Sequence, residues 1–156
     1  MTTDPTLVER LQRLADLLPR LEAKDSGAEF GQWAPSRQSE PGVWTMPYVE
    51  YGSLERAFRE ASIGWIRPDI NWVAWASTDA AVAMRKEPDR LARATPEELA
   101  HLLTALVRGD RFNEGLLLDA CKEGLLARIA RRAAALAIEP MESKESVEQE
   151  RGADPT

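Results

Sequence analysis

The chain of 156 residues has one cysteine, Cys121, and one histidine, His101. A single cysteine cannot form a disulfide within the chain, which excludes a small secreted scaffold held by disulfides. One histidine and one cysteine also leave no ligand set for zinc, no Cys–His nucleophilic pair and no Ser–His–Asp triad. The glycine-rich signatures of phosphate-binding and dinucleotide-binding loops are missing as well. These absences disfavour the familiar classes of enzyme, and we expect no cofactor and no metal ion.

The sequence has no long apolar run. No stretch approaches the about 18 apolar residues that a membrane span needs, and residues 1–5 lack the basic and apolar segments of a secretory leader. Hydrophobic residues make up 44% and charged residues 29% of the chain, and these proportions are typical of a globular domain. We therefore expect a cytoplasmic protein that does not bind a membrane.

An excess of positive charge is absent as well. Lysine and arginine number 20 against 26 aspartates and glutamates, and the net charge of −6 disfavours binding to nucleic acid through bulk electrostatics. Six acidic and two basic residues fall in 139–156, so residues 1–138 carry only −2 and a local basic face stays open. We expect a single helical domain over 1–138 and a disordered acidic tail over 139–156.

The first helix is predicted over residues 5–24. Asp4 is a capping acid and Pro5 suits the first helical position. Leucines then follow at spacings of three and four residues, and we expect this stripe to pack on the protein's own core. Pro19 lies inside the pattern, so the helix should kink or end near Leu18. The stripe consists of Leu7, Leu11, Leu14, Leu18 and Leu21.

Residues 25–47 are rich in glycine, proline, serine and glutamine, which excludes a helix interior. The segment nevertheless contains Phe30, Trp33, Val43 and Trp44. Two short strands around 29–34 and 43–48, joined by a polar turn, would account for both features. The sequence therefore predicts a small β-hairpin over 29–48.

Apolar spacing predicts two further helices in the middle of the chain. Ser53 is positioned to cap the first, which should end at Gly64. Asn71 is positioned to cap the second, predicted over about 72–86, before Pro88. Trp72 and Trp75 are three residues apart in this helix and therefore share a face.

The strongest local signal is a capping box at Thr95 and Glu98, with proline between them at the first helical position. We expect Gly109 to end the helix that follows and Asp110 to cap a new helix, which runs to about Glu123. A last helix should begin near residue 125. The fold class is thus mainly α, a compact array of about six short helices with a small β-hairpin.

The segment 108–115 combines both signs of charge at a predicted turn. Arg108 and Arg111 beside a helix N-terminus could hold a phosphate or carboxylate, with Glu114 as a base. In the structural interpretation, Asp110 caps the helix, an arginine pairs with Glu114, and Phe112 fills the core. An acid at the cap repels an incoming anion, which favours the structural interpretation.

The aromatic residues are concentrated in one part of the chain. They could line a pocket for a flat ligand by stacking, with Asn71 at its rim, or form a small core beneath an irregular segment. All five tryptophans and both tyrosines lie within 33–75: Trp33, Trp44, Trp65, Trp72, Trp75, Tyr48 and Tyr51.

The last predicted helix carries Arg128, Arg131 and Arg132 within about a third of its circumference. Three arginines on one face could contact the phosphates of a nucleic acid. Acids nearby and the preference of cations for helix C-termini also explain a solvated face, and we favour that explanation.

Several short motifs follow one another along the chain, among them Phe30-Gly31-Gln32-Trp33, Met46-Pro47-Tyr48, Asn71-Trp72-x-x-Trp75 and Arg108-x-Asp110-Arg111-Phe112-x-Glu114-Gly115. In this order they resemble the prokaryotic domain-of-unknown-function family 6508, over residues 7–137. The family commonly has an aspartate before the paired tryptophans, where this chain has Asn71, and a histidine after Glu-Gly, where this chain has Leu116. The resemblance implies no established activity, substrate or site.

Our first hypothesis is a non-enzymatic protein that binds another macromolecule, with a protein as its partner. Two alternatives remain: an enzyme acting on a small ligand or phosphoester through Arg108, Arg111 and Glu114, and a nucleic-acid-binding module that uses the three arginines of the last helix. The first hypothesis depends on the tryptophan pair lying close to the segment 108–115. The candidate ligand-binding residues are Asn71, Trp72, Trp75, Arg108, Asp110, Arg111 and Glu114.

Overall fold

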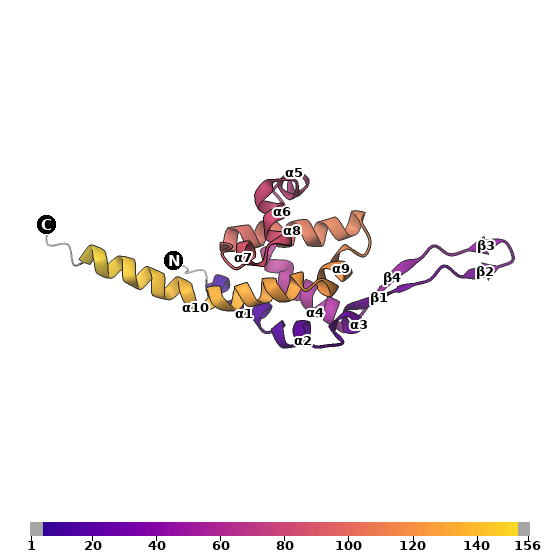
Figure 1. Ribbon diagram of the computed structural model, residues 1–156, viewed down its shortest axis with the longest axis horizontal. Helices are drawn as coiled ribbons and strands as arrows, with labels where there is room; N and C mark the ends of the chain where they lie inside the picture. Colours follow the sequence, from indigo (N-terminus) through magenta and orange to yellow (C-terminus); the bar gives the residue numbers. More distant parts are fainter. Residues whose placement is uncertain (1–4, 153–156) are drawn as a thin grey trace.

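A computed structural model of the chain describes the backbone of residues 5–152 and the side chains of residues 7–138. A helical body carries a long β-hairpin that projects from one side, and the last helix extends from the other (Figure 1). The predicted fold class, mainly α with a small antiparallel hairpin, is confirmed. The elements are α1 (Pro5–Ala15), α2 (Leu18–Glu22), α3 (Ser26–Phe30), β1 (Gly31–Ala34), β2 (Gln38–Glu40), β3 (Val43–Trp44), β4 (Tyr48–Tyr51), α4 (Ser53–Ser62), the 3₁₀-helix η1 (Ile63–Trp65), α5 (Trp72–Ala76), α6 (Asp79–Lys86), α7 (Pro88–Leu91), α8 (Pro96–Phe112), α9 (Leu116–Lys122) and α10 (Leu125–Gly152).

The buried side chains form one continuous cluster around α8. The N-terminal helix divides as predicted, because Pro19 lies in the first turn of α2 and cannot continue α1. Helix α1 packs along α10, so the two ends of the described chain share the core. The largest fully buried side chains include Leu11, Leu14, Phe30, Leu54, Phe58, Trp65, Met84, Leu91, Leu99, Leu102 and Leu103.

Helix α3 contradicts the prediction that residues 25–47 contain no helix. The helix has five residues and packs against α4 and α9. Its last residue, Phe30, is fully buried and meets the ring of Tyr51 edge-on, with 6.2 Å between centroids. Burial of this one ring stabilises a turn of helix that the local composition disfavours.

The hairpin is longer than predicted, and its second strand lies further along the chain. Strand β1 pairs with β4, so that Trp33 lies opposite Val49, while β2 pairs with β3 near the tip. Between these two ladders, the Thr45 amide donates to the Arg37 carbonyl over 2.7 Å, and the Arg37 amide donates to the Thr45 hydroxyl over 3.0 Å. These bonds make residues 31–51 one ribbon, which we refer to as the arm.

Gly52 fixes the base of the arm. Its amide donates to the Phe30 carbonyl over 2.8 Å, and a Cβ atom at this position would lie 2.3 Å from the carbonyl oxygen of Glu29. Only glycine allows the two backbones to approach so closely. Gly52 also occupies the N-cap position of α4, so the prediction that Ser53 caps this helix is wrong.

Helix α8 runs through Gly109 and Asp110, so the prediction that it ends at Gly109 is wrong. Glycine inside a helix costs only about 1 kcal/mol. Here the missing side chain leaves room for Leu116, whose Cδ2 would lie 2.9 Å from a Cβ at Gly109. The chain turns instead at Gly115, which has φ +96° and occupies the N-cap position of α9.

The helix predicted over 72–86 divides in two. Asn71 caps α5 as predicted, since its side-chain oxygen accepts from the Ala74 amide over 3.1 Å. Thr78 then caps α6 by accepting from the Ala81 amide over 3.2 Å. Because a second helix starts at this cap, the chain changes direction between α5 and α6. The angle between the two helices determines which side chains of α6 lie close to Trp72 and Trp75.

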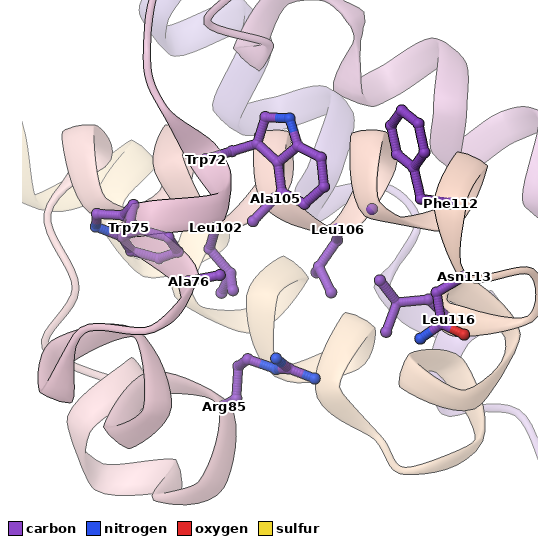
Figure 2. A pocket seen from close by; sticks show the side chains of 11 residues that line it. Trp72, Trp75, Ala76, Arg85, Leu102, Ala105, Leu106, Phe112, Asn113 and Leu116 are labelled. Atoms are coloured by element: carbon purple, nitrogen blue, oxygen red, sulfur yellow. The ribbon is translucent and has the colours of Figure 1, made fainter.

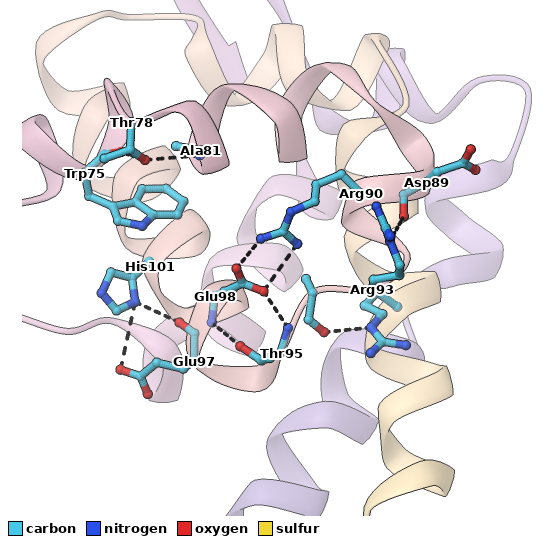
Figure 3. Close-up of polar contacts among 12 residues, drawn as sticks. Trp75, Thr78, Ala81, Asp89, Arg90, Arg93, Thr95, Glu97, Glu98 and His101 are labelled. Carbon is cyan, nitrogen blue, oxygen red and sulfur yellow. Dashed lines mark hydrogen bonds and ion pairs between the residues drawn. The ribbon is translucent and has the colours of Figure 1, made fainter.

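The capping box at the start of α8 is confirmed (Figure 3). The Glu98 amide donates to the Thr95 hydroxyl over 3.1 Å, and the Glu98 carboxylate accepts from the Thr95 amide over 3.0 Å. The same carboxylate forms an ion pair with Arg90, whose guanidinium holds the pKa of Glu98 below its usual value. One acid therefore ties the start of α8 to α7.

Replacing Glu98 by glutamine should reduce the sensitivity of the fold to acid. A carboxylate whose pKa is lowered by folding adds stability above its unfolded pKa of about 4.3 and loses this contribution as the pH falls through the folded value. Glutamine keeps the capping hydrogen bonds but cannot titrate. In urea unfolding, Glu98→Gln should be less stable than the unmodified chain at neutral pH, and the gap should close on acidification. A gap independent of pH would contradict this assignment.

Helix α10 begins at Leu125, and its side chains are described as far as residue 138. The disordered acidic tail predicted over 139–156 stays a prediction, because the side chains of this segment and the backbone of 153–156 lie outside the described residues. Within the part of the chain that the structure describes, no helix is long and apolar enough to cross a membrane.

Candidate functional site

A cavity of about 250 Å³ lies where α5 passes over the C-terminal half of α8 (Figure 2). Trp72 and Trp75 of α5 form one wall, and Phe112 stands at the end of α8, stacked on Trp72 with 6.0 Å between ring centroids. The tryptophan pair and the segment 108–115 therefore lie together, as the first hypothesis requires. We refer to this cavity as the α5/α8 pocket.

The floor of the α5/α8 pocket is aliphatic, and two polar side chains stand at its edge. Leu102, Leu106 and Leu116 form the floor. Arg85 reaches in from α6, on the side opposite Trp72 in Figure 2, and Asn113 closes the end beside Leu116. Arg85 was not a candidate from the sequence, because only the turn between α5 and α6 directs its side chain toward the tryptophans.

The candidate residues Arg108, Arg111 and Glu114 do not line the α5/α8 pocket. Glu114 instead accepts a hydrogen bond from the Val49 amide over 2.8 Å and so holds the arm to the body. No ion pair joins it to either arginine among the side chains described, and Phe112 is 81% exposed. The structural interpretation, with an arginine–Glu114 pair and a buried Phe112, is therefore wrong in these two respects.

Asp110 is buried, with 5% of its surface exposed, and is the centre of a polar network. Its carboxylate accepts from the Tyr51 hydroxyl over 2.7 Å, from the Arg59 guanidinium over 2.9 Å and from the Leu117 amide over 3.1 Å. Burial and the Asp110 hydrogen bond raise the pKa of Tyr51, so its hydroxyl stays protonated. Arg59 also pairs with Glu55 one turn earlier on α4.

This network assigns Asp110 a structural task. Asp110 is not the N-cap residue of a helix, because it lies within α8. Its carboxylate nevertheless accepts a hydrogen bond from the Leu117 amide in the first turn of α9, on the other side of the turn at Gly115. It also joins α8 to β4 and α4. The sequence placed Tyr51 only in the aromatic cluster and gave no signal for Arg59, because both lie far from Asp110 along the chain.

The tryptophans divide among three environments. Trp65 is buried in the core, whereas Trp72 and Trp75 are half-buried at the α5/α8 pocket. Trp33 and Trp44 lie on the arm, 45% and 63% exposed. The core interpretation therefore applies to Trp65, and the pocket interpretation applies to Trp72 and Trp75.

The arm is fixed to the body near its base and exposes apolar side chains toward its tip. Glu114 holds the Val49 amide, and the Trp33 ring lies over Gly115, where a Cβ would come within 2.5 Å of it. Exposed apolar side chains continue along the arm from there: Trp33, Val43, Trp44, Met46 and Tyr48.

Arg128, Arg131 and Arg132 line a shared hollow between α10 and α7 together with Asp89. Each has a partner within the fold. Arg131 pairs with Glu22, Arg132 donates to the Ala94 carbonyl over 2.8 Å, and Arg128 donates to carbonyls at Gly124 and Arg85. Elsewhere, no group of three or more potential metal-ligating side chains occurs among the residues described.

The fold and its surfaces define a small helical domain with an aromatic pocket and a projecting β-ribbon. A family model described as a family of unknown function, DUF6508, matches residues 6–139, and the chain belongs to this family. No curated protein and no solved structure matches the chain.

Proposed function

We propose that the protein is a non-enzymatic binding protein that holds a protein partner with its arm. The observation that carries this proposal is the exposure of large apolar side chains on a ribbon that leaves the body. Trp44 is 63% and Met46 81% exposed, and Trp33 and Tyr48 lie further down the same ribbon. Proteins that stay monomeric seldom leave contiguous apolar patches in water, and tryptophan, tyrosine and methionine are enriched at interfaces.

The stability of the arm favours the same conclusion. A two-stranded ribbon is marginally stable in water by itself. The body supports this one only near its base, through Glu114 and the ring of Trp33 over Gly115. Toward the tip, the ribbon has only its own hydrogen bonds, between Arg37 and Thr45 and between β2 and β3, and the apolar side chains there are exposed in the described structure. A partner that covers Val43, Trp44 and Met46 would stabilise the tip.

Charge and shape favour a protein as the partner of the arm. The arm carries Arg37 against Glu40 and Glu50, so it offers no cationic surface to phosphates. A convex apolar tip fits a concave apolar groove, which is a feature of protein surfaces. We place this interaction in the cytoplasm, where a free thiol such as Cys121 stays reduced.

The test compares tip variants with a variant elsewhere on the surface. The immobilised full chain captures partners from extracts of its source organism, and each captured protein is then purified and bound to the chain alone. The double variant Trp44→Ala, Met46→Ala should weaken this reconstituted binding at least about 30-fold, the loss typical of an interface hot spot. Ile63→Ala removes an equally exposed apolar side chain from η1 and should leave binding unchanged.

Two results would overturn the proposal. One is a purified partner that binds the tip variant as tightly as the unmodified chain. The other is binding of the tip to nucleic acid or phospholipid vesicles with no purified protein able to replace them. Because the replaced side chains are exposed, thermal unfolding of all three proteins should coincide.

A further inference from the structure

We infer that the α5/α8 pocket is a binding site for a small aromatic carboxylate, with its ring against the indoles and its carboxylate on Arg85. This site is separate from the arm, so the inference goes beyond the proposed function and does not depend on it. Three features carry it: the size of the cavity, its aromatic wall, and an arginine whose side chain has no partner among the described residues.

The size of the cavity fits one ring with a short substituent. An apolar cavity of about 150 Å³ holds one benzene molecule, whereas this cavity measures about 250 Å³. The remaining space is enough for a carboxylate on one or two methylene groups but not for a nucleotide or a peptide segment. The site therefore suits a ligand of low mass.

The lining fits a flat apolar ring. Trp72 and Trp75 lie on one face of α5 and offer two indoles, while Leu102 and Leu106 supply an aliphatic floor opposite them. Both tryptophans are half-buried, so a ligand can reach them without opening the core. Aromatic rings gain more from such neighbours than aliphatic groups of equal size, because their quadrupoles favour offset or edge-to-face packing.

Arg85 fits the carboxylate. Its guanidinium forms no hydrogen bond and no ion pair with the described side chains, although most other arginines of the body have partners. Glu123 and Lys86 share a neighbouring hollow with Arg85, yet no ion pair joins Arg85 to Glu123 in the described structure. A guanidinium binds a carboxylate through two parallel hydrogen bonds. The pocket thus combines an aromatic wall with a free cation at its edge.

Titration with phenylacetate tests the ligand class. The indole N–H signals of the full chain are followed by NMR and assigned with single tryptophan variants. The signals of Trp72 and Trp75 should shift on binding, while that of Trp44, on the arm, should stay in place. Phenylacetamide, which lacks the charge, and cyclohexylacetate, which lacks the aromatic ring, should each bind more weakly. Benzylamine, which carries the opposite charge, should not bind.

Variants at the edge of the pocket test the role of Arg85. Arg85→Met should weaken phenylacetate binding by at least about tenfold, the loss of a charge-assisted hydrogen-bonded pair. Lys86→Met removes the neighbouring cation, which lies outside the α5/α8 pocket. This change should alter the affinity for phenylacetate by less than about twofold, because solvent and salt screen the charge of an exposed side chain that does not contact the ligand. Both side chains are exposed, so neither change should alter thermal unfolding.

The inference would be overturned if phenylacetamide bound as tightly as phenylacetate, or if Arg85→Met kept the affinity of the unmodified chain. It would also be overturned if no probe shifted the signals of Trp72 and Trp75 up to its solubility limit. None of these results bears on the arm, because Trp44 and Met46 take no part in the titration.

Discussion

Replacing Asp110 by alanine is expected to lower the free energy of unfolding by about 2–6 kcal/mol, because two donors inside the fold lose their acceptor at about 1–3 kcal/mol each. Asp110 is 5% exposed and accepts from Tyr51, Arg59 and the Leu117 amide. Its loss would leave the Tyr51 hydroxyl and the Leu117 amide without this acceptor, whereas Arg59 would keep its ion pair with Glu55. A loss of this size is a large fraction of the about 5–15 kcal/mol that stabilises an ordinary domain. Urea unfolding followed by circular dichroism measures it.

Two further variants separate the parts of this effect. Asp110→Asn keeps an oxygen for the Leu117 amide but removes the charge opposite Arg59, so its cost should be intermediate. Asp69→Ala removes an exposed acid and should change stability by less than about 0.5 kcal/mol. If Asp110→Ala cost no more than Asp69→Ala, the network would not hold α4, α8 and α9 together.

The same network shows where sequence reasoning stops. The charged segment 108–115 was recognisable, and Asp110 was a candidate within it. Its partners Tyr51 and Arg59 are 59 and 51 residues away along the chain, and no local pattern connects them. Asp110 lies five residues before Gly115, and an acid at that position is also compatible with an N-cap. The sequence alone therefore could not show whether Asp110 caps the helix that follows it directly or accepts from the Leu117 amide across the turn.

Local signals predicted well where a few neighbouring residues decide the structure. The capping box at Thr95, the cap at Asn71 and the break at Pro19 depend on side chains within four positions. Tertiary packing decided the rest. Burial of Phe30 stabilises α3, although the composition of this segment disfavours a helix. Gly109 stays inside α8, where a larger residue would collide with Leu116.

The α5/α8 pocket was partly predictable for the same reason. The spacing of Trp72 and Trp75 predicts a shared face, and the structure places the end of α8 against it. Arg85 could not be predicted, because the angle between α5 and α6 depends on the two-residue connection that Thr78 ends. A prediction of one continuous helix over 72–86 directs Arg85 elsewhere.

Replacing Gly115 by alanine is expected to cost about 2–5 kcal/mol. Alanine at φ +96° pays about 1–2 kcal/mol for the left-handed backbone. The new Cβ would also lie 2.5 Å from the Trp33 ring, and overpacking of this kind adds about 1–3 kcal/mol. Gly124→Ala is the matched control, because Gly124 has φ +85° and nothing within 4 Å of the added Cβ. The difference between the two variants in urea unfolding measures the contact between the arm and the turn.

A second substitution tests whether Trp33 causes that difference. In a Trp33→Ala background the ring is gone, so Gly115→Ala should cost no more than Gly124→Ala does. If Gly115→Ala stays more costly than Gly124→Ala in this background, the added methyl destabilises the turn itself rather than its contact with Trp33, and the base of the arm does not pack on Gly115. Suppression would mean that the glycine is required by a ring 82 positions earlier in the chain, since a left-handed turn alone tolerates alanine at about 1–2 kcal/mol. The turn between α8 and α9 would then fix the direction in which the arm leaves the body.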